Sequence, residues 1–195
     1  MAQGNQPRPL HGVGSLLDLP STSRVKFLWS RLEQEFGLRG ALVMPYPHIS
    51  YQVAQDYDRP SLETALEELA RDTPPISIRT TGLGSFDGNW PVLFVAVQKD
   101  EALRELHQRV WETCLPHARD VFSYYHPDPW VPHITLVHGE ERGSLPLSAE
   151  LVQRALGSLN SGVYRWEISI DNIALVWDYG TTHKPARTFL LQGRG

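Results

Sequence analysis

The sequence predicts an α+β fold of two similar lobes, each a sheet covered by helices. Its 195 residues, 41% of them hydrophobic, suit a single globular domain. An order of strand, helix and strand, closed by a Pro-His-Ile triplet, occurs once from residue 12 and again from residue 92. Such a repeat is typical of an internal duplication. No segment reads as an interdomain linker, so we expect one bilobal domain over residues 11–195 after a flexible tail over residues 1–10.

The first half opens with a strand, a helix and two further strand candidates. Residues 12–19 are a short apolar run that fits a buried strand. A helix is expected next, because residues 21–23 are Ser, Thr and Ser, which can cap it. Apolar residues then recur at helical spacing until two nearby glycines end the pattern. Segment 41–44 is apolar and segment 49–53 alternates in part.

The middle of the chain predicts two helices and two strands. A helix opens at residues 58–61, which read Asp-Arg-Pro-Ser, and it carries leucines at helical spacing. Residues 76–83 and 92–97 look like strands separated by a glycine-rich turn. Another helix is expected over residues 100–114. Its apolar residues share one face: Leu103, Leu106, Val110 and Cys114.

The remaining segments complete the second lobe. A last helix is expected over residues 148–158. Two strands are expected around an Asp171-Asn172 turn. The strand-like segments of this part are residues 119–125, 134–137, 163–170, 173–177 and 188–191.

Composition and charge exclude several classes of protein. The formal net charge of −4 gives no general attraction to nucleic acid, so a nucleic-acid ligand needs a local site. The single cysteine excludes an intramolecular disulfide and a cysteine-based zinc site. No apolar run approaches the roughly 18 residues of a membrane helix, and the first ten residues lack an apolar signal core. We therefore expect a cytoplasmic protein without membrane association, with no cofactor and no protein partner indicated.

Chemistry is concentrated in the two repeated segments. They read Pro47-His48-Ile49-Ser50-Tyr51 and Pro132-His133-Ile134-Thr135-Leu136, 85 residues apart. In a strand, residues two apart point the same way, so each histidine shares a face with its hydroxyl residue. Two histidines can act as general base and general acid near neutral pH, and two hydroxyls can bind phosphate oxygens. The pattern therefore favours phosphodiester cleavage without a metal.

These two motifs resemble the signature motifs of the 2H phosphoesterase superfamily. The wider pattern, from about residue 12 to residue 191, is similar to its bacterial 2′-5′ RNA ligase-like branch, the RNA 2′,3′-cyclic phosphodiesterases. Ser50 stands where the family more often has Thr, and Tyr51 where it more often has an aliphatic residue. The resemblance implies a bilobal duplicated fold with two antiparallel sheets, flanking helices and a central active-site cleft.

The resemblance also implies the reaction and its residues. The reaction is hydrolysis of a 2′,3′-cyclic phosphate, on an RNA 3′ end or a small cyclic nucleotide, to a 2′-phosphate. By analogy with the family, His133 takes a proton from water, His48 gives one to the leaving 3′ oxygen, and Ser50 and Thr135 hold the phosphate. Nothing in the sequence itself distinguishes the base from the acid.

Alternatives remain open at this stage. Within the family the substrate could be a 2′-5′ linked oligonucleotide, ligated or cleaved, or an ADP-ribose cyclic phosphate. From another class, the chain could be a module that binds RNA ends without turnover. A third reading is a zinc hydrolase that uses His126, His133 and His138.

Aromatic and basic residues near the motifs are further candidates. Tyr51 and Trp130 are candidate substrate-binding residues that could stack on a nucleobase, although small domains more often place aromatic residues in the core. Four others could line the site or meet phosphate, or could be ordinary surface residues: Phe86, Trp90, Arg79 and Arg142.

Overall fold

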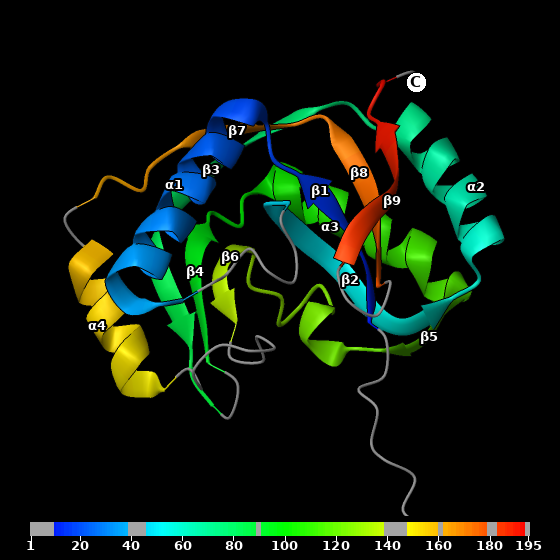
Figure 1. The fold of residues 1–195 in the computed structure, drawn as a ribbon. Helices are drawn as coiled ribbons and strands as arrows, with labels where there is room; N and C mark the ends of the chain where they lie inside the picture. Colours follow the sequence, from blue (N-terminus) through cyan, green and yellow to red (C-terminus); the bar gives the residue numbers. More distant parts are fainter. Residues whose placement is uncertain are drawn as a thin grey trace, which may run out of the picture.

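In the part of the chain that the structure describes, two antiparallel sheets are flanked by four helices (Figure 1). The structure is a computed structural model, and it describes residues 10–38, 46–88, 91–138, 148–159, 162–178 and 183–193. This architecture confirms the α+β class that the repeat predicts and the pair of antiparallel sheets that the family resemblance implies. Among the helices described, none is long and apolar enough to cross a membrane.

The sheets have five and four strands. In the first, the strand order is β5 (Ala118–Val121), β2 (His48–Tyr57), β1 (His11–Leu16), β8 (Asn172–Asp178) and β9 (His183–Leu190). In the second, the order is β6 (His133–His138), β4 (Val92–Val97), β3 (Ile76–Phe86) and β7 (Glu167–Ile170). Every neighbouring pair is antiparallel.

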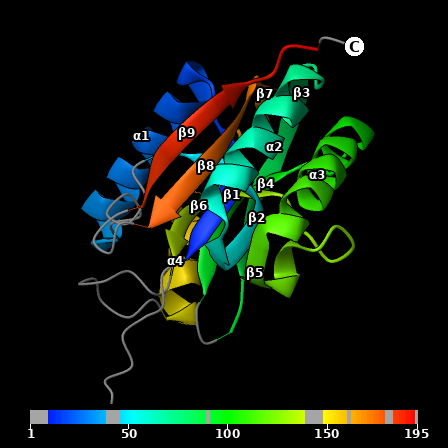
Figure 2. The same cartoon turned by 90° about the vertical axis from the view of Figure 1, so that its right-hand side faces the viewer.

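The helices of the two halves are exchanged between the sheets. Helix α1 (Leu19–Phe36) follows a strand of the five-stranded sheet but contacts β6 and α4 (Ala149–Leu159), on the four-stranded sheet. Helix α3 (Glu101–Cys114) follows β4 but packs mainly on β2 and α2 (Arg59–Arg71). Figure 2 shows α2 and α3 side by side over the five-stranded sheet. Each sheet is therefore covered in part by a helix that follows a strand of the other sheet.

The duplication is visible in strand register as well as in element order. Strand β2 pairs with β1, which opens the first half, and β6 pairs with β4, which opens the second. In each pair the register slips by one residue directly after the hydroxyl residue of the motif, at Tyr51 in β2 and at Leu136 in β6. Each slip is a β-bulge, which re-aims neighbouring side chains. The two motifs therefore occupy equivalent places, as the repeat predicts.

Helix α1 begins earlier than expected. Asp18 is its N-cap, with a side-chain oxygen that accepts from the Ser21 backbone N–H at 2.8 Å. The backbone N–H groups in the first turn of a helix have no acceptor within the helix, so a proline, which lacks this group, fits there. Pro20 therefore lies inside α1 rather than ending the strand before it. The expected caps at residues 21–23 are therefore wrong. The second Asp18 oxygen accepts from the Ser169 N–H at 2.9 Å and anchors the helix start to β7.

The predicted turn at residues 171–172 is not a hairpin. Strand β7 belongs to the four-stranded sheet and β8 to the five-stranded sheet, so the chain crosses between lobes there. The Asn172 side chain accepts from the Leu16 backbone N–H at 2.9 Å and donates to the Leu16 carbonyl at 3.0 Å. It thus extends the pairing of β1 where the chain enters β8.

Other boundaries differ by a few residues. The expected strand over residues 119–125 ends at Val121, and a short 3-10 helix, Ser123–Tyr125, follows. Strand β3 continues to Phe86, through the segment expected as a turn. Strand β9 begins at His183 rather than at residue 188. Segment 41–44 lies outside the described residues.

Candidate active site

The two motif strands carry their chemical groups on one face and apolar groups on the other. Ile49 and Ile134 are fully buried, whereas His48, Ser50, His133 and Thr135 are all partly exposed. This is the alternation that the sequence predicts for two strands. Strands β2 and β6 also contact each other, although they belong to different sheets.

Both histidines are oriented by the same backbone contact. Nδ1 of His48 lies 3.0 Å from the carbonyl oxygen of Tyr46, and Nδ1 of His133 lies 2.7 Å from the carbonyl oxygen of Val131. A carbonyl oxygen can only accept a hydrogen bond, so Nδ1 carries the proton in each ring. Nε2 is then the nitrogen of each ring that can take up or release a proton at the site.

The surroundings of His133 are aromatic. Its ring meets Phe86 edge-to-face at 5.0 Å between centroids and lies 5.2 Å from the ring of Phe94. Burial lowers the pKa of His133, which favours a neutral ring, although the Val131 carbonyl opposes this effect. Gly84 of β3 lies opposite Phe94 of β4, and a Cβ at Gly84 would stand 2.6 Å from the Phe94 ring. Glycine thus makes room for the ring beside His133.

Tyr51 does not stack on a substrate. Its side chain is completely buried, and its hydroxyl lies 2.9 Å from Ser15 Oγ, which donates to the Asn172 carbonyl. Burial raises the pKa of the phenol. The alternation of β2 explains the correction, because Tyr51 lies on the strand face opposite His48 and Ser50.

Trp130 is also buried and is unavailable to a nucleobase. Its side chain is 2% exposed, and its ring stacks on His107 with centroids 3.8 Å apart. The indole N–H donates to the Ser50 carbonyl at 3.0 Å. The expected stacking role is therefore wrong, and the residue instead connects the segment before the second motif to the first motif.

The remaining candidates divide clearly. Phe86 does line the site, through His133. Arg79 is exposed on β3, as an ordinary surface arginine would be. Trp90 and Arg142 lie outside the described residues. The sequence did not predict His107 or Phe94 at the site. His107 contacts the first motif at the Tyr51 carbonyl, and Phe94 contacts the second at the His133 ring.

A three-histidine zinc site is not formed. Among the described residues, no three His, Cys, Asp or Glu side chains are grouped so that they could hold a metal ion. His126 instead meets the Trp111 ring edge-on and lies beside Asp128, while His133 lies among phenylalanines. The reading that joins His126, His133 and His138 is therefore not supported.

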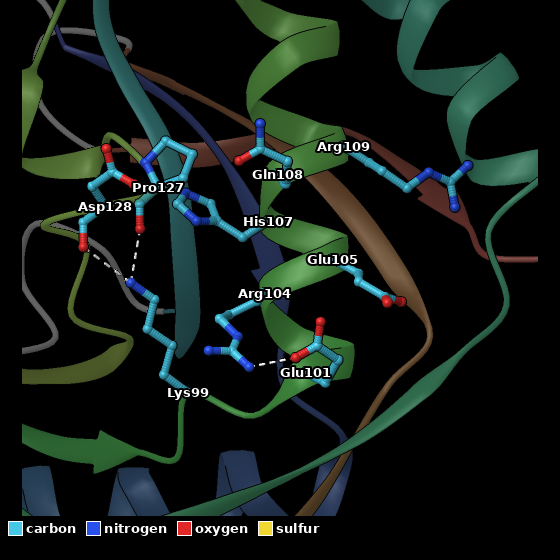
Figure 3. A pocket seen from close by; sticks show the side chains of 9 residues that line it. All are labelled: Lys99, Glu101, Arg104, Glu105, His107, Gln108, Arg109, Pro127 and Asp128. Atoms are coloured by element: carbon cyan, nitrogen blue, oxygen red, sulfur yellow. Dashed lines mark hydrogen bonds and ion pairs between the residues drawn. The ribbon is translucent and has the colours of Figure 1, made fainter.

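A pocket of about 650 Å³ lies beside α3, and no residue of either motif belongs to its lining (Figure 3). It is lined by three cationic side chains, Lys99, Arg104 and Arg109, and by the carboxylates of Glu101, Glu105 and Asp128. The balance of charges gives it no preference for a phosphate. Lys99 directs its ammonium group at backbone carbonyls of the loop before the second motif.

Fold and site together define a duplicated two-sheet protein with a His-x-Ser/Thr motif on one strand of each sheet. The chain belongs to the 2′-5′ RNA ligase superfamily, the 2H phosphoesterases, whose family model matches residues 20–182. Membership makes it an enzyme of the phosphodiesterase type. A search of curated protein sequences finds no match.

Solved structures share the fold over nearly the whole chain. The protein TT0787 of Thermus thermophilus has a TM-score of 0.61 at 19% identity, over 96% of this chain and 100% of its own. A phosphoesterase structure gives 0.57 at 14%, over 95% and 98%. E. coli LigT complexed with NADP+ gives 0.55 at 15%, over 95% and 98%. At these identities the likeness establishes the fold.

Proposed function

We propose that this protein hydrolyses a 2′,3′-cyclic phosphate, on an RNA 3′ end or a small nucleotide, to a 2′-phosphate. The observation that carries the proposal is the matched orientation of His48 and His133. Each ring donates from Nδ1 to a carbonyl two residues earlier, so in each ring Nε2 is the nitrogen that can exchange a proton. A partly exposed hydroxyl follows each ring on the same strand face.

In the proposed reaction His133 is the base and His48 the acid. Neutral His133 takes a proton from water through Nε2 while the water oxygen bonds to phosphorus. The bond from phosphorus to O3′ breaks, and protonated His48 gives its Nε2 proton to O3′. The 2′-phosphate remains as product. The lowered pKa of His133 supports its role as base, because it keeps that ring neutral.

The hydroxyls of Ser50 and Thr135 donate to the non-bridging phosphate oxygens. Such bonds to a charged group strengthen as negative charge develops on the oxygens. Structures of E. coli LigT with phosphate, 3′-AMP, ATP and NADP+ support a nucleotide or RNA-type substrate for this fold. Because two imidazoles supply both proton transfers, the proposed step needs no metal.

The test uses the purified full chain and a short RNA that ends in a 2′,3′-cyclic phosphate, in EDTA. Products are separated to distinguish the 2′- from the 3′-phosphate. We expect only the 2′-phosphate, and a rate lower by on the order of 10² to 10⁴ in His48→Ala and in His133→Ala. His126→Ala is the matched control, since that histidine is half exposed and lies outside both motifs.

Three outcomes would contradict the proposal. A 3′-phosphate product would overturn the assignment of the leaving oxygen. Loss of activity in EDTA, restored by a divalent metal, would overturn the two-histidine mechanism. No turnover by the folded wild type of either the RNA or a 2′,3′-cyclic mononucleotide would reject the proposed substrate, and 2′-5′ linked oligonucleotides and ADP-ribose cyclic phosphate would be tried next.

A further inference from the structure

A cluster of three side chains, two of them buried and the third partly exposed, joins the two motifs. The first is Trp130, two residues before Pro132-His133, whose indole N–H donates to the Ser50 carbonyl of β2 at 3.0 Å. The second is His107 of α3, whose Nε2 donates to the Tyr51 carbonyl at 2.9 Å. The third is Lys99, which donates to the Trp130 carbonyl at 2.9 Å. Each motif is thus tied to the same cluster through backbone atoms.

The cluster takes the place of a missing strand. Strand β5 pairs with β2 only from Ala54 to Tyr57, so within the described chain no strand lies beside the motif part of that edge. The β-bulge at Tyr51 lies in this part of β2. Buried carbonyls need donors, and here the donors are the side chains of Trp130 and His107. The position of the first motif is therefore set by a residue that leads into the second.

Trp130 is itself in contact with His107 and Lys99. Its ring stacks on His107 with an interplanar angle of 27°, and Lys99 lies 5.8 Å from the ring centroid. Lys99 also donates to the carbonyls of Pro127 and Asp128, at 2.7 and 3.3 Å, and so fastens the whole loop that carries Trp130 (Figure 3). Figure 3 shows His107 pointing from α3 toward this loop. The loop is thus held by His107 of α3 and by Lys99, which lies two residues before that helix.

We propose that Trp130, held by His107 and Lys99, is a positioning residue that sets the spacing between the two histidine motifs. This rests on the proposal that His48 and His133 carry the reaction. Trp130 acts on His48 through the backbone of Ser50 and on His133 through its own short connection along the chain. Proton transfers demand close alignment, and a displacement of about 1 Å can cost 10²-fold in rate.

Trp130→Phe tests this with a minimal change, because phenylalanine keeps a ring for the stack but removes the N–H. Trp29→Phe is the matched control: that tryptophan is also buried, in α1, and no residue that the structure describes accepts a hydrogen bond from its Nε1. With the cyclic-phosphate RNA as substrate, we expect Trp130→Phe to lower kcat about tenfold or more. KM should stay within about threefold and Tm should fall by about 2–4 °C. Trp29→Phe should keep the wild-type kcat.

Lys99→Met provides a second route if Trp130→Phe folds poorly. Methionine keeps most of the aliphatic stem and removes the donors to all three loop carbonyls. The proposal predicts that it too lowers kcat more than it raises KM. A wild-type kcat in a folded Trp130→Phe or Lys99→Met protein would overturn the proposed positioning role of Trp130. An equal loss in Trp130→Phe and Trp29→Phe, or a change in KM alone, would do the same.

Failure of the positioning role of Trp130 and failure of the proposed function are distinguishable. If the wild type turns over substrate and the histidine variants do not, a Trp130→Phe protein with the wild-type kcat rejects only the positioning role. If the wild type is inactive, the proposed function fails. Crystal structures of Trp130→Phe and Trp29→Phe then test the positioning role by itself. Strand β2 should move relative to β6 in the first variant and stay in place in the second.

Discussion

The ring of Phe86 meets the imidazole of His133 edge-to-face, with centroids 5.0 Å apart and planes at 87°. Phe86 ends β3 and His133 begins β6, two strands that both pair with β4. Phe94 of β4 completes the enclosure. The contact explains why the ring of His133 is less readily protonated than an ordinary histidine. An apolar enclosure disfavours the charged ring, and burial lowers the pKa of His133 accordingly.

Opening that enclosure should shift the pH profile. Phe86→Ala admits water to His133, so the pKa of its ring should rise toward the ordinary histidine value. The proposed base must be neutral, so the acid limb of the kcat/KM profile should move to higher pH, and activity below that limb should fall. The measurement is kcat/KM of the RNA substrate against pH. Phe27→Ala, on the exposed side of α1, is the control and should leave the profile unchanged. An acid limb that stays in place in Phe86→Ala would contradict the argument.

Gly14 should be indispensable to the first motif. It pairs with Ser50 across β1 and β2, and a Cβ at this position would collide with the backbone carbonyl of Ile49. Backbone cannot turn aside as a side-chain end can, so Gly14→Ala must push the strands apart between His48 and Ser50. We expect a loss of about 1–3 kcal/mol in the free energy of unfolding, measured in urea, with a fall in kcat.

Gly12→Ala is the matched control on the same strand pair. A Cβ at Gly12 would meet Gln52 O and Val53 Cγ2 at 3.5 Å, which is ordinary van der Waals contact. This variant should keep the wild-type kcat and change stability by less than about 1 kcal/mol. Equal effects of the two substitutions would show that close backbone approach at Gly14 is not what matters.

His107 should make the fold sensitive to acid. Burial lowers its pKa from the ordinary 6.5 to about 4, so at pH 5 the unfolded chain binds a proton on this residue and the folded chain does not. The free energy of unfolding should therefore fall as pH falls from 6.5 to 4, by about 3 kcal/mol from this group. Urea unfolding against pH measures it. His107→Gln should flatten the pH dependence of the free energy of unfolding. His117, whose ring is hydrogen-bonded to Ser61, provides the control, and His117→Gln should retain the pH dependence.

How far the sequence leads depends on whether a feature is local. The alternation in Pro47-His48-Ile49-Ser50 and its repeat is local, and it places the imidazoles and hydroxyls on one strand face as the structure has them. Helix α3 was placed with bounds only one residue off, because its cap at Asp100 and its apolar spacing are both local. The same alternation could have excluded Tyr51 from the site, since it has the parity of Ile49.

Features that depend on pairing across the chain were not accessible. The register slips after Ser50 and Thr135 depend on strands β1 and β4, and the crossover at Asp171-Asn172 depends on which sheet each strand joins. The role of Trp130 could not be predicted for the same reason, because its partners Ser50, His107 and Lys99 are distant in sequence. A signal for His107 did exist: it lies four residues after Leu103, on the buried face of α3.

The hydroxyl of Thr135, rather than its size, should be what the second motif requires. Thr135 is partly exposed on the face of His133, where the proposed mechanism has it donate to a phosphate oxygen. Thr135→Val keeps the volume and removes the donor, whereas Thr135→Ser keeps the donor and removes a methyl group. A hydrogen bond to a charged group contributes about 1.5–3 kcal/mol, so kcat/KM should fall by roughly 10- to 150-fold in Thr135→Val. Thr135→Ser should stay within about threefold, because the first motif carries Ser50 at the equivalent place. Steady-state kinetics on the cyclic-phosphate RNA measure both, and a Thr135→Val enzyme as active as Thr135→Ser would exclude the hydroxyl from phosphate binding.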